Sequence, residues 1–248
     1  EEVLGEEVGQ QAMAERYGCK TYERIEELIA DPDVELVDIA TRSLDHFRHA
    51  RMALEAGKYV FLEKPMCTRG ADARELQRLS EERGGLLFIR HNRRYEPGFN
   101  RVAEIIRSGL LGDVFLIKLR RLHFARREDW QTLLEFGGGL LNNWGPHIVD
   151  HACRLMDADI VDLQSYLGNY AALGDAEDHL KLVFRGANGR VVDMEISGAA
   201  ALSPEPEYIV WGTRGALTCH HELTLKYIDP GQELQARGAD PETPPMDM

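Results

Sequence analysis

The sequence predicts an α/β protein of two parts: a doubly wound parallel sheet, then an α+β region with a large, mainly antiparallel open sheet. Up to about residue 90, short apolar runs alternate with amphipathic helical segments, a pattern typical of parallel strands joined by helical crossovers. Beyond that residue, short strands and turn signals favour antiparallel pairing. The 248 residues, 44% of them hydrophobic, can fill two packed domains. We expect these domains at 1–92 and 93–248.

The parallel sheet is expected to form from three apolar runs that are separated by helices. The run VELVDIA at 34–40 and the run YVFL at 59–62 are short and mostly apolar, which is typical of strands buried on both faces. Glycines end the helical patterns between them, because glycine readily adopts the left-handed geometry that closes a helix. Strands are therefore expected at 34–40, 59–62 and 86–89, and helices at 10–17, 22–30, 45–55 and 71–83.

The second part is expected to begin with one helix and to continue mainly as strands. The helix covers 97–108 and ends at Gly109, and a long strand follows over 114–124. Turn signals such as Asn188-Gly189 separate the later apolar alternations. The proline-rich stretch at 230–248 is interpreted as a loop or a frayed end. Further strands are predicted at 160–170, 179–184, 191–197, 207–211, 216–219 and 223–227.

The composition argues against several classes of protein. With 29 basic and 42 acidic residues, the formal net charge of -13 would repel nucleic acids and anionic membranes. No apolar run approaches the roughly 18 residues that a membrane span needs. The four cysteines lie far apart and form neither a C-x-x-C pair nor a disulfide framework. A cytoplasmic protein with reduced thiols fits these observations best.

The motif Glu63-Lys64-Pro65 directly follows the apolar run at 59–62. Ligands collect beyond the carboxyl ends of strands in an open parallel sheet, so a lysine placed there faces a crevice. Its ammonium group can hydrogen-bond a substrate hydroxyl, and burial beside a positive charge would lower its pKa toward acid-base use. For an arbitrary lysine a strand-end salt bridge is the more common role. The context here favours a functional Lys64.

A glycine run at 137–139 is followed by Asn143, His147 and Asp150. Glycines let a backbone approach a ligand or another segment closely. If a helix begins near Asn143, positions 143 and 147 lie one turn apart on the same face. Because histidine titrates near neutrality, His147 can take a hydroxyl proton while hydride leaves the same carbon. The alternative is a histidine that only caps a helix.

Two further clusters admit more than one interpretation. His147, Asp150 and His151 lie close together, as do His46 and His49, but no cysteine or H-E-x-x-H motif accompanies them, so no metal site is expected. Alternation along a strand places Lys118 and Arg120 on one face, where they bind an anionic substrate group or pair with carboxylates; pairing is favoured. The whole basic cluster is Lys118, Arg120, Arg121, Arg126 and Arg127.

Together these motifs resemble the glucose-fructose oxidoreductase / inositol dehydrogenase (Gfo/Idh/MocA) family. The middle of that family's Rossmann domain is similar to VDIAT at 37–41, His46, ALEAG at 53–57 and EKP at 63–65. Its domain junction is similar to HNRRY at 91–95, and the start of its catalytic helix is similar to residues 137–150. The likeness extends from about residue 8 to residue 228, and the order and spacing of the motifs make it specific.

The resemblance implies an NAD(P)-dependent oxidoreductase that transfers hydride between a nicotinamide and a hydroxyl-bearing carbon of a sugar, cyclitol or sugar derivative. It implies that Lys64 contacts substrate and the nicotinamide ribose, that His147 moves the proton, and that Asp150 braces the site. It also implies a homodimer or homotetramer formed through the antiparallel sheet. The candidate cofactor-binding residues are Thr41, Arg42, His46, Glu63, Lys64, Pro65 and Asn92, and the candidate substrate-binding residues are Arg93, Trp130, Asn143 and His147.

The sequence departs from the family pattern in two places. Asn143 stands where the family has an aspartate; an asparagine can orient a hydroxyl but cannot take its proton, so His147 is the expected base. Family members also open with a strand, a Gly-x-Gly-x-x-Gly turn and a second strand, and they close with a further C-terminal segment. The sequence is therefore expected to be truncated at both ends. Without the first strand and the glycine-rich loop, the 248 residues alone should bind cofactor poorly.

Two alternatives to the enzyme stay open from the sequence. A non-catalytic sensor of the same fold would bind a dinucleotide or a sugar without turnover, because fold does not fix function. An inactive fragment is the other alternative. The presence of Lys64 and His147 favours the enzyme, whereas Asn143 leaves the sensor open.

Overall fold

The computed structural model describes residues 12, 14–202, 205–229 and 231–232, and these form two compact units. The first unit contains the described residues up to His91 together with Glu135–Gly138. The second contains Asn92–Leu134 and the described residues from Gly139 onward. The short segment Glu135–Gly138 thus leaves the second part of the chain and packs in the first, which the sequence does not predict.

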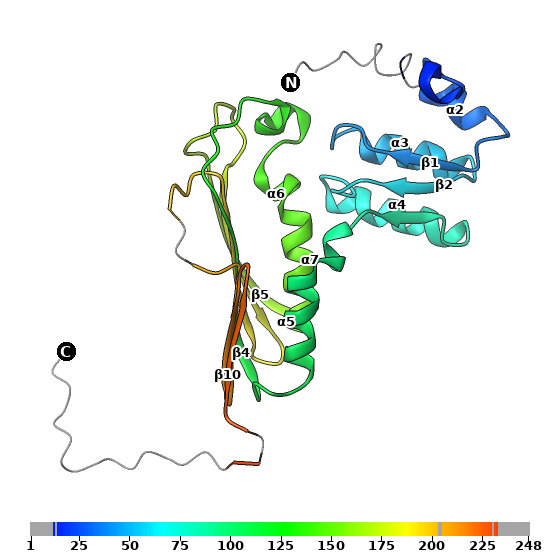
Figure 1. Cartoon of the computed structure of the whole chain (residues 1–248). Coiled ribbons are helices and arrows are strands. Elements are labelled where there is room, and N and C mark those ends of the chain that lie inside the picture. Colours follow the sequence, from blue (N-terminus) through cyan, green and yellow to red (C-terminus); the bar gives the residue numbers. More distant parts are fainter. Residues whose placement is uncertain (1–11, 13, 203–204, 230, 233–248) are drawn as a thin grey trace, which may run out of the picture. The chain divides into compact units, whose positions relative to one another are not determined.

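The first unit is a three-stranded parallel sheet with the order β1-β2-β3 (Figure 1). Helices α3 and α4 pack against each other and bury the apolar side chains of the strands, including Val60 and Leu62. This arrangement confirms the predicted parallel pairing. The elements are α2 (Ile25–Ala30), β1 (Leu36–Ile39), α3 (His46–Glu55), β2 (Tyr59–Leu62), α4 (Gly70–Glu82) and β3 (Leu87–Ile89).

The helix expected at 10–17 lies partly outside the described residues, which leave out 1–11 and 13. Residues 14–17 are helical, and Gly18 ends the helix as predicted: its N–H donates to the carbonyl oxygen of Ala14 (2.8 Å) with a positive φ of 63°. Most of the tail expected at 230–248 also lies outside the described residues, because residues 230 and 233–248 are left out.

The second unit is a seven-stranded sheet with the order β10-β9-β8-β4-β7-β6-β5. Every neighbouring pair is antiparallel except β4 and β7, which confirms the predicted, mainly antiparallel sheet. Its strands are β4 (Val114–Leu122), β5 (Ile160–Gly168), β6 (His179–Gly186), β7 (Val191–Ser197), β8 (Tyr208–Gly212), β9 (Gly215–Cys219) and β10 (Leu223–Tyr227). Its helices are α5 (Pro97–Arg107), α6 (Leu140–Asn143) and α7 (Gly145–Met156), with short 3₁₀ turns at Asn92–Tyr95 and Trp130–Thr132. A third 3₁₀ turn, Leu134–Phe136, begins in the second unit and continues into the segment that belongs to the first.

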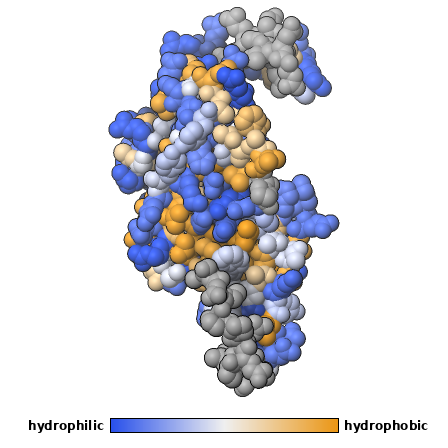
Figure 2. Space-filling view, turned by 90° about the vertical axis from the view of Figure 1, so that its left-hand side faces the viewer, coloured by the Kyte–Doolittle hydropathy of each residue, from blue (hydrophilic) through white to orange (hydrophobic). Residues whose placement is uncertain are grey.

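The helices α5 and α7 lie along one face of this sheet, and the core forms between them and the strands (Figure 1). Strict alternation builds it: Leu180, Leu182 and Phe184 of β6 are buried, while the residues between them face the other way. Among the described residues, no helix covers the opposite face. Figure 2 views the molecule from that side and shows apolar and polar side chains interspersed on the surface.

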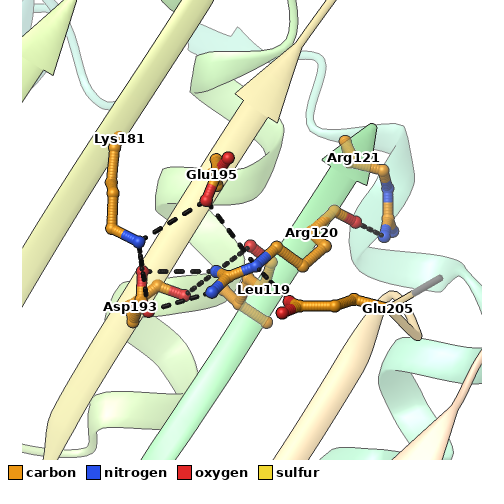
Figure 3. Close-up of polar contacts among 7 residues, drawn as sticks. All are labelled: Leu119, Arg120, Arg121, Lys181, Asp193, Glu195 and Glu205. Carbon is orange, nitrogen blue, oxygen red and sulfur yellow. Dashed lines mark hydrogen bonds and ion pairs between the residues drawn. The ribbon is translucent and has the colours of Figure 1, made fainter. Parts of the chain in front are cut away.

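The guanidinium of Arg120 is the centre of an ion-pair cluster on the open face (Figure 3). Its side chain is only 5% exposed, and it donates to Asp193 (2.9 Å) and to Glu205 (2.8 Å). Lys181 adds a second contact to Asp193 at 3.2 Å, and Glu195 lies 3.9 Å from Arg120. Carboxylate pairing, favoured over anion binding from the sequence, is therefore confirmed for Arg120.

Replacing Arg120 by methionine is expected to lower the free energy of unfolding of the second unit by about 3 kcal/mol, because it takes a buried guanidinium from Glu205 and leaves Asp193 with Lys181 alone. Arg185→Met is the matched control, because Arg185 lies on β6 in an exposed pair with Asp162 at 3.8 Å and should cost no more than about 1 kcal/mol. Urea denaturation followed by tryptophan fluorescence measures both. Equal losses would show that the cluster adds nothing beyond a surface pair.

Candidate active site

The loops that follow β1 and β2 lie side by side in the first unit, because Ile39 and Leu62 are paired residues at the carboxyl ends of these parallel strands. His46, at the start of α3, connects the two loops. Its Nδ1 lies 2.6 Å from the carbonyl oxygen of Pro65, and its Nε2 lies 3.0 Å from that of Thr41. His46 is almost fully buried, so it shapes the loops that carry the candidate cofactor residues.

The other candidates of the first unit surround the same strand ends. Lys64 is half-buried, and the peptide between it and Pro65 is cis. Glu63 forms an ion pair with Arg90 at 3.6 Å. The hydroxyl of Thr41 lies 3.2 Å from Nδ1 of His49, whose pKa is lowered by burial. The structure thus brings these residues together at one edge of the parallel sheet, where a ligand would bind.

The glycine run explains why the segment Glu135–Gly138 packs in the first unit. Gly137 has a φ of 69°, and a Cβ there would lie 3.1 Å from Leu44 and 3.3 Å from Thr68, closer than side chains normally approach. The preceding Phe136 places its ring 4.4 Å from the guanidinium of Arg42. Of the two alternatives predicted for the glycines, the close approach is therefore to another segment of the chain, which contains Leu44. The same approach places Phe136 against the side chain of Arg42.

The helix that carries His147 begins later than expected. Asn143 is the last residue of α6, and α7 begins at Gly145 with Pro146 in its first turn. The expectation of one helix that begins near Asn143 is therefore wrong: Asn143 and His147 lie on two helices with Trp144 between them. A proline is favoured in the first turn because its missing N–H would have no partner in the helix. His147 is 6% exposed, and its ring lies 6.4 Å from that of Trp144.

A loop before the glycine run orients Asn143. Asn143 donates from Nδ2 to Oε1 of Gln131 (2.6 Å), and Arg127 donates to the same oxygen (2.8 Å). The neighbouring Trp130 is half-buried at the start of the same 3₁₀ turn. On the other side, Glu177 accepts a hydrogen bond from the backbone N–H of Leu141 (2.8 Å). These contacts fix the amide of Asn143 within a hollow of the second unit.

The 3₁₀ turn at Asn92–Tyr95 holds α7 in place. Arg94 donates from Nε and from a terminal nitrogen to the two oxygens of Asp150 (2.8 and 2.6 Å), a bidentate pair of the strong kind. His151, one turn after His147, stacks on Phe99 with ring centroids 3.9 Å apart. Its Nε2 lies 3.0 Å from the carbonyl oxygen of Arg93. These contacts fix the position and rotation of the helix that carries His147, and Asp150 contributes to them through Arg94.

The chemistry of its partners fixes the proton positions on His151. The carbonyl of Arg93 can only accept, so Nε2 carries the proton and donates to it. Nδ1 then accepts from the hydroxyl of Tyr208 (3.2 Å), whose oxygen accepts in turn from Arg121 (3.1 Å). Burial lowers the pKa of His151 below its ordinary value of 6.5, in agreement with a neutral ring. Protonation of Nδ1 would end its role as the acceptor of the Tyr208 hydroxyl proton.

The stability of the second unit is therefore expected to fall as the pH drops below about 6.5. In that range His151 takes up a proton in the unfolded chain but stays neutral in the folded chain. The free energy of unfolding therefore falls with falling pH until the pH passes the lowered pKa of the folded state. The three tryptophans, Trp130, Trp144 and Trp211, all lie in the second unit. Urea denaturation followed by their fluorescence at pH 8 and at pH 5.5 isolates His151 from His49, whose lowered pKa acts in the first unit.

His151→Asn is the variant that checks this prediction. It removes the titrating ring, so the loss of stability between pH 8 and pH 5.5 should shrink, although the variant is less stable at both values because a buried contact is lost. His179→Asn, a half-buried histidine on β6, is the control and should keep the pH dependence. An unchanged pH dependence in His151→Asn would contradict the assignment.

The predicted site residues fall into two groups. The first unit contains Thr41, Arg42, His46, Glu63, Lys64 and Pro65, and the second contains Asn92, Arg93, Trp130, Asn143 and His147. Asn92 is exposed at the start of its 3₁₀ turn, and Arg93 places its guanidinium 4.3 Å from the ring centroid of Trp144. Gln131, Arg94 and Tyr208, which orient the second group, were not predicted.

The described residues contain neither a candidate metal cluster nor a membrane-spanning helix. No cluster of three or more histidine, cysteine, aspartate or glutamate side chains there could hold a metal ion. No helix in the described part of the chain is both long and apolar enough to cross a membrane.

Known proteins resemble the chain over most of its length. The model of the oxidoreductase family with an NAD-binding Rossmann fold matches residues 5–91, and that of the GFO/IDH/MocA C-terminal domain matches residues 99–218. These matches cover more than half of the chain, so the chain belongs to the GFO/IDH/MocA family of oxidoreductases. Its first unit corresponds to the family's NAD-binding Rossmann fold.

Individual relatives agree with the family assignment. An uncharacterised oxidoreductase of Schizosaccharomyces pombe is 30% identical over 91% of this chain and 61% of its own length. The scyllo-inositol 2-dehydrogenase (NADP(+)) IolW of Bacillus subtilis is 32% identical over 53% of this chain and 37% of its own. The crystal structure of an NAD-binding protein from Listeria innocua has a TM-score of 0.80 at 28% identity, covering 88% of this chain and 62% of that one. The chain thus spans about three fifths of the first of these relatives.

Proposed function

We propose that the protein containing this chain transfers hydride between a nicotinamide dinucleotide, NAD or NADP, and a hydroxyl-bearing carbon of a sugar, cyclitol or sugar derivative. The observation that carries this proposal is His147: a nearly buried imidazole in the first turn of a helix whose position is fixed by Arg94, Asp150 and His151. A fixed base is what proton removal from a hydroxyl needs. The name of the Bacillus subtilis relative, an inositol dehydrogenase, supports the substrate class.

The proposed roles of the residues follow from their chemistry. When bound, the nicotinamide supplies the two-electron acceptor. His147 takes the hydroxyl proton as the C–H bond releases its hydride and the carbon becomes a carbonyl. Lys64 carries an ammonium group that can hydrogen-bond a substrate hydroxyl and stabilise negative charge that develops on its oxygen. Asn143, whose amide is oriented by Gln131, positions the hydroxyl and cannot take its proton.

We propose the same division of work between the two parts of the chain that the motifs predict: 1–92 for the dinucleotide and 93–248 for the substrate and for oligomerisation. The first unit fits a dinucleotide because polar residues gather at the carboxyl ends of adjacent parallel strands, with His46 connecting their loops. The candidates for contact are Thr41, Arg42, Glu63, Lys64 and Pro65, and Asn92 on the side of the second unit.

We propose that the open face of the seven-stranded sheet joins copies of the chain into a homodimer or homotetramer. This face exposes large apolar residues, such as Tyr166 and Trp211, and it also carries the ion-pair cluster of Arg120 (Figure 3). A twofold axis would bring the same patch of two copies together. Analytical ultracentrifugation checks the proposal: Trp211→Glu should yield monomers.

We also propose that the protein works in the cytoplasm. All four cysteines carry free thiols in the structure, and two of them, Cys19 and Cys153, are exposed. Exposed free thiols persist in a reducing compartment. Fractionation of the source cells with an antibody against the chain checks this location.

The experiment that tests the function is a titration of the full protein with NADH and NADPH, followed by turnover on a panel of sugars and cyclitols. Binding with turnover of a member of the panel is the expected result. Absence of dinucleotide binding would refute the proposal, and binding without turnover of any substrate would favour a non-catalytic sensor. The replacement of the family's aspartate by Asn143 is the observation that keeps this second candidate in the experiment.

A further inference from the structure

We propose that the cavity beside Trp144 accepts the end of the substrate that does not react, and that this end is neutral and polyhydroxylated, without a carboxylate or phosphate group. The inference rests on the proposed function, because it takes the substrate to react at His147. It goes further by stating which substrates the site excludes.

The cavity lies entirely in the second unit, next to the proposed base. It consists of two adjoining hollows of about 300 and 270 Å³, which share Arg121, Trp144, Glu207 and His220 in their walls. Together they approach the size of pockets that bind small molecules. Trp144 lines both hollows, and its ring lies edge to face with that of His147, with the ring centroids 6.4 Å apart. Trp144 thus links the proposed base with the cavity wall, and we place the unreacting end of the substrate along this ring.

Each arginine in the cavity wall is already paired with a carboxylate. Arg93 pairs with Glu96, and Arg121 pairs with Glu96 (3.4 Å) and with Glu207 (2.8 Å). Arg120, at the edge of the cavity, is saturated by Asp193 and Glu205 (Figure 3). The charges in the wall balance, so these guanidinium groups present no uncompensated positive charge to a ligand.

The balance decides the class of ligand. An anionic group would have to displace Glu207 from Arg121 or lie beside the partly exposed carboxylates of Glu205 and Glu207, where like charges repel each other. Hydroxyl groups incur no such cost, because each donates to a carboxylate oxygen and accepts from a guanidinium N–H without breaking the pairs. The wall therefore selects a neutral polyol arm.

The test compares matched ligand pairs on the full protein at pH 8, where imidazole groups carry little charge. The pairs are glucose with glucuronate and myo-inositol with its monophosphate. Dissociation constants come from quenching of tryptophan fluorescence, because Trp144 lines the cavity. In any pair of which at least one member binds, the neutral member is expected to bind at least about tenfold more tightly than the anionic one. Tighter binding of the anionic member, or binding of neither, would overturn the inference.

Glu207→Gln tests the cause of the selectivity. It removes one negative charge and leaves Arg121 with Glu96 alone, so the preference for the neutral ligand should fall several-fold. Glu104→Gln is the matched control, because Glu104 lies in an exposed pair with Arg101 on α5, and it should leave the preference unchanged. The inference is wrong if both variants give the same ratio.

The binding readout separates this inference from the proposed function. Selective binding of neutral polyols without turnover supports the cavity assignment and refutes the oxidoreductase. Turnover with a preference for the anionic members supports the oxidoreductase and refutes the cavity assignment.

Discussion

His147→Asn in the full protein lowers kcat by about a hundredfold to ten-thousandfold, the range that a positioned general base contributes. Asparagine keeps a hydrogen-bonding side chain of similar reach but cannot take the hydroxyl proton. Dinucleotide binding should change little, because His147 belongs to the second unit. Steady-state turnover with NAD or NADP, together with a nucleotide titration of the same sample, measures both quantities.

The control for this substitution is His179→Asn, which alters a half-buried histidine on β6 that packs against Tyr166 and Tyr170. It should keep nearly full turnover. The profile of kcat/KM against pH gives a second readout, because loss of the base removes the fall in rate toward acidic pH. A variant that retains more than a tenth of the activity with an unchanged profile would exclude His147 as the base.

Lys64→Ala is expected to lower kcat by about a hundredfold while it weakens dinucleotide binding far less. The hydrogen bond from the ammonium group strengthens as charge develops on the substrate oxygen, so its loss is felt mainly in the transition state. The loop itself should keep its shape, because His46 holds it through the backbone carbonyl of Pro65. Turnover and the nucleotide dissociation constant, measured on one preparation, give the two numbers.

The matched control is Lys226→Ala, which removes an exposed lysine from β10. Its kcat and its nucleotide affinity should equal those of the unaltered protein. If Lys64→Ala lost affinity and kcat by the same factor, the lysine would be a binding group and not a participant in the reaction.

Local signals predicted most of the secondary structure. The runs at 59–62 and 191–197 are strands with the expected bounds. The first is a continuous apolar run, as in a buried parallel strand, and the second alternates buried and less buried residues, as in a strand with one face in the core. The break between α6 and α7 was not predicted, although Gly145-Pro146 carries its signal: a proline is favoured at the start of a helix. The prediction rested only on the four-residue spacing of Asn143 and His147, which one continuous helix would place on the same face.

The contacts that orient the candidate site could not be predicted in the same way. Arg94 and Asp150 are 56 positions apart, and His151 and Tyr208 are 57 apart, so no local pattern connects them. The glycine run indicated a close approach, but it could not name Leu44 as the neighbour of Gly137. Strand alternation predicted that Arg120 pairs with carboxylates. It could not identify Glu205 as a partner, because Glu205 lies in the loop before β8 and outside any strand pattern.

The place of β4 in the sheet has a consequence for how the chain folds. β4 is the first strand of the second unit to be synthesised, yet it lies in the middle, between β7 and β8. Its partners emerge from the ribosome about 70 to 90 residues later, so both edges of a nine-residue strand stay unpaired during that time. We expect slow, late closure of this sheet, and nascent chains that stop between β4 and β7 to be bound by chaperones.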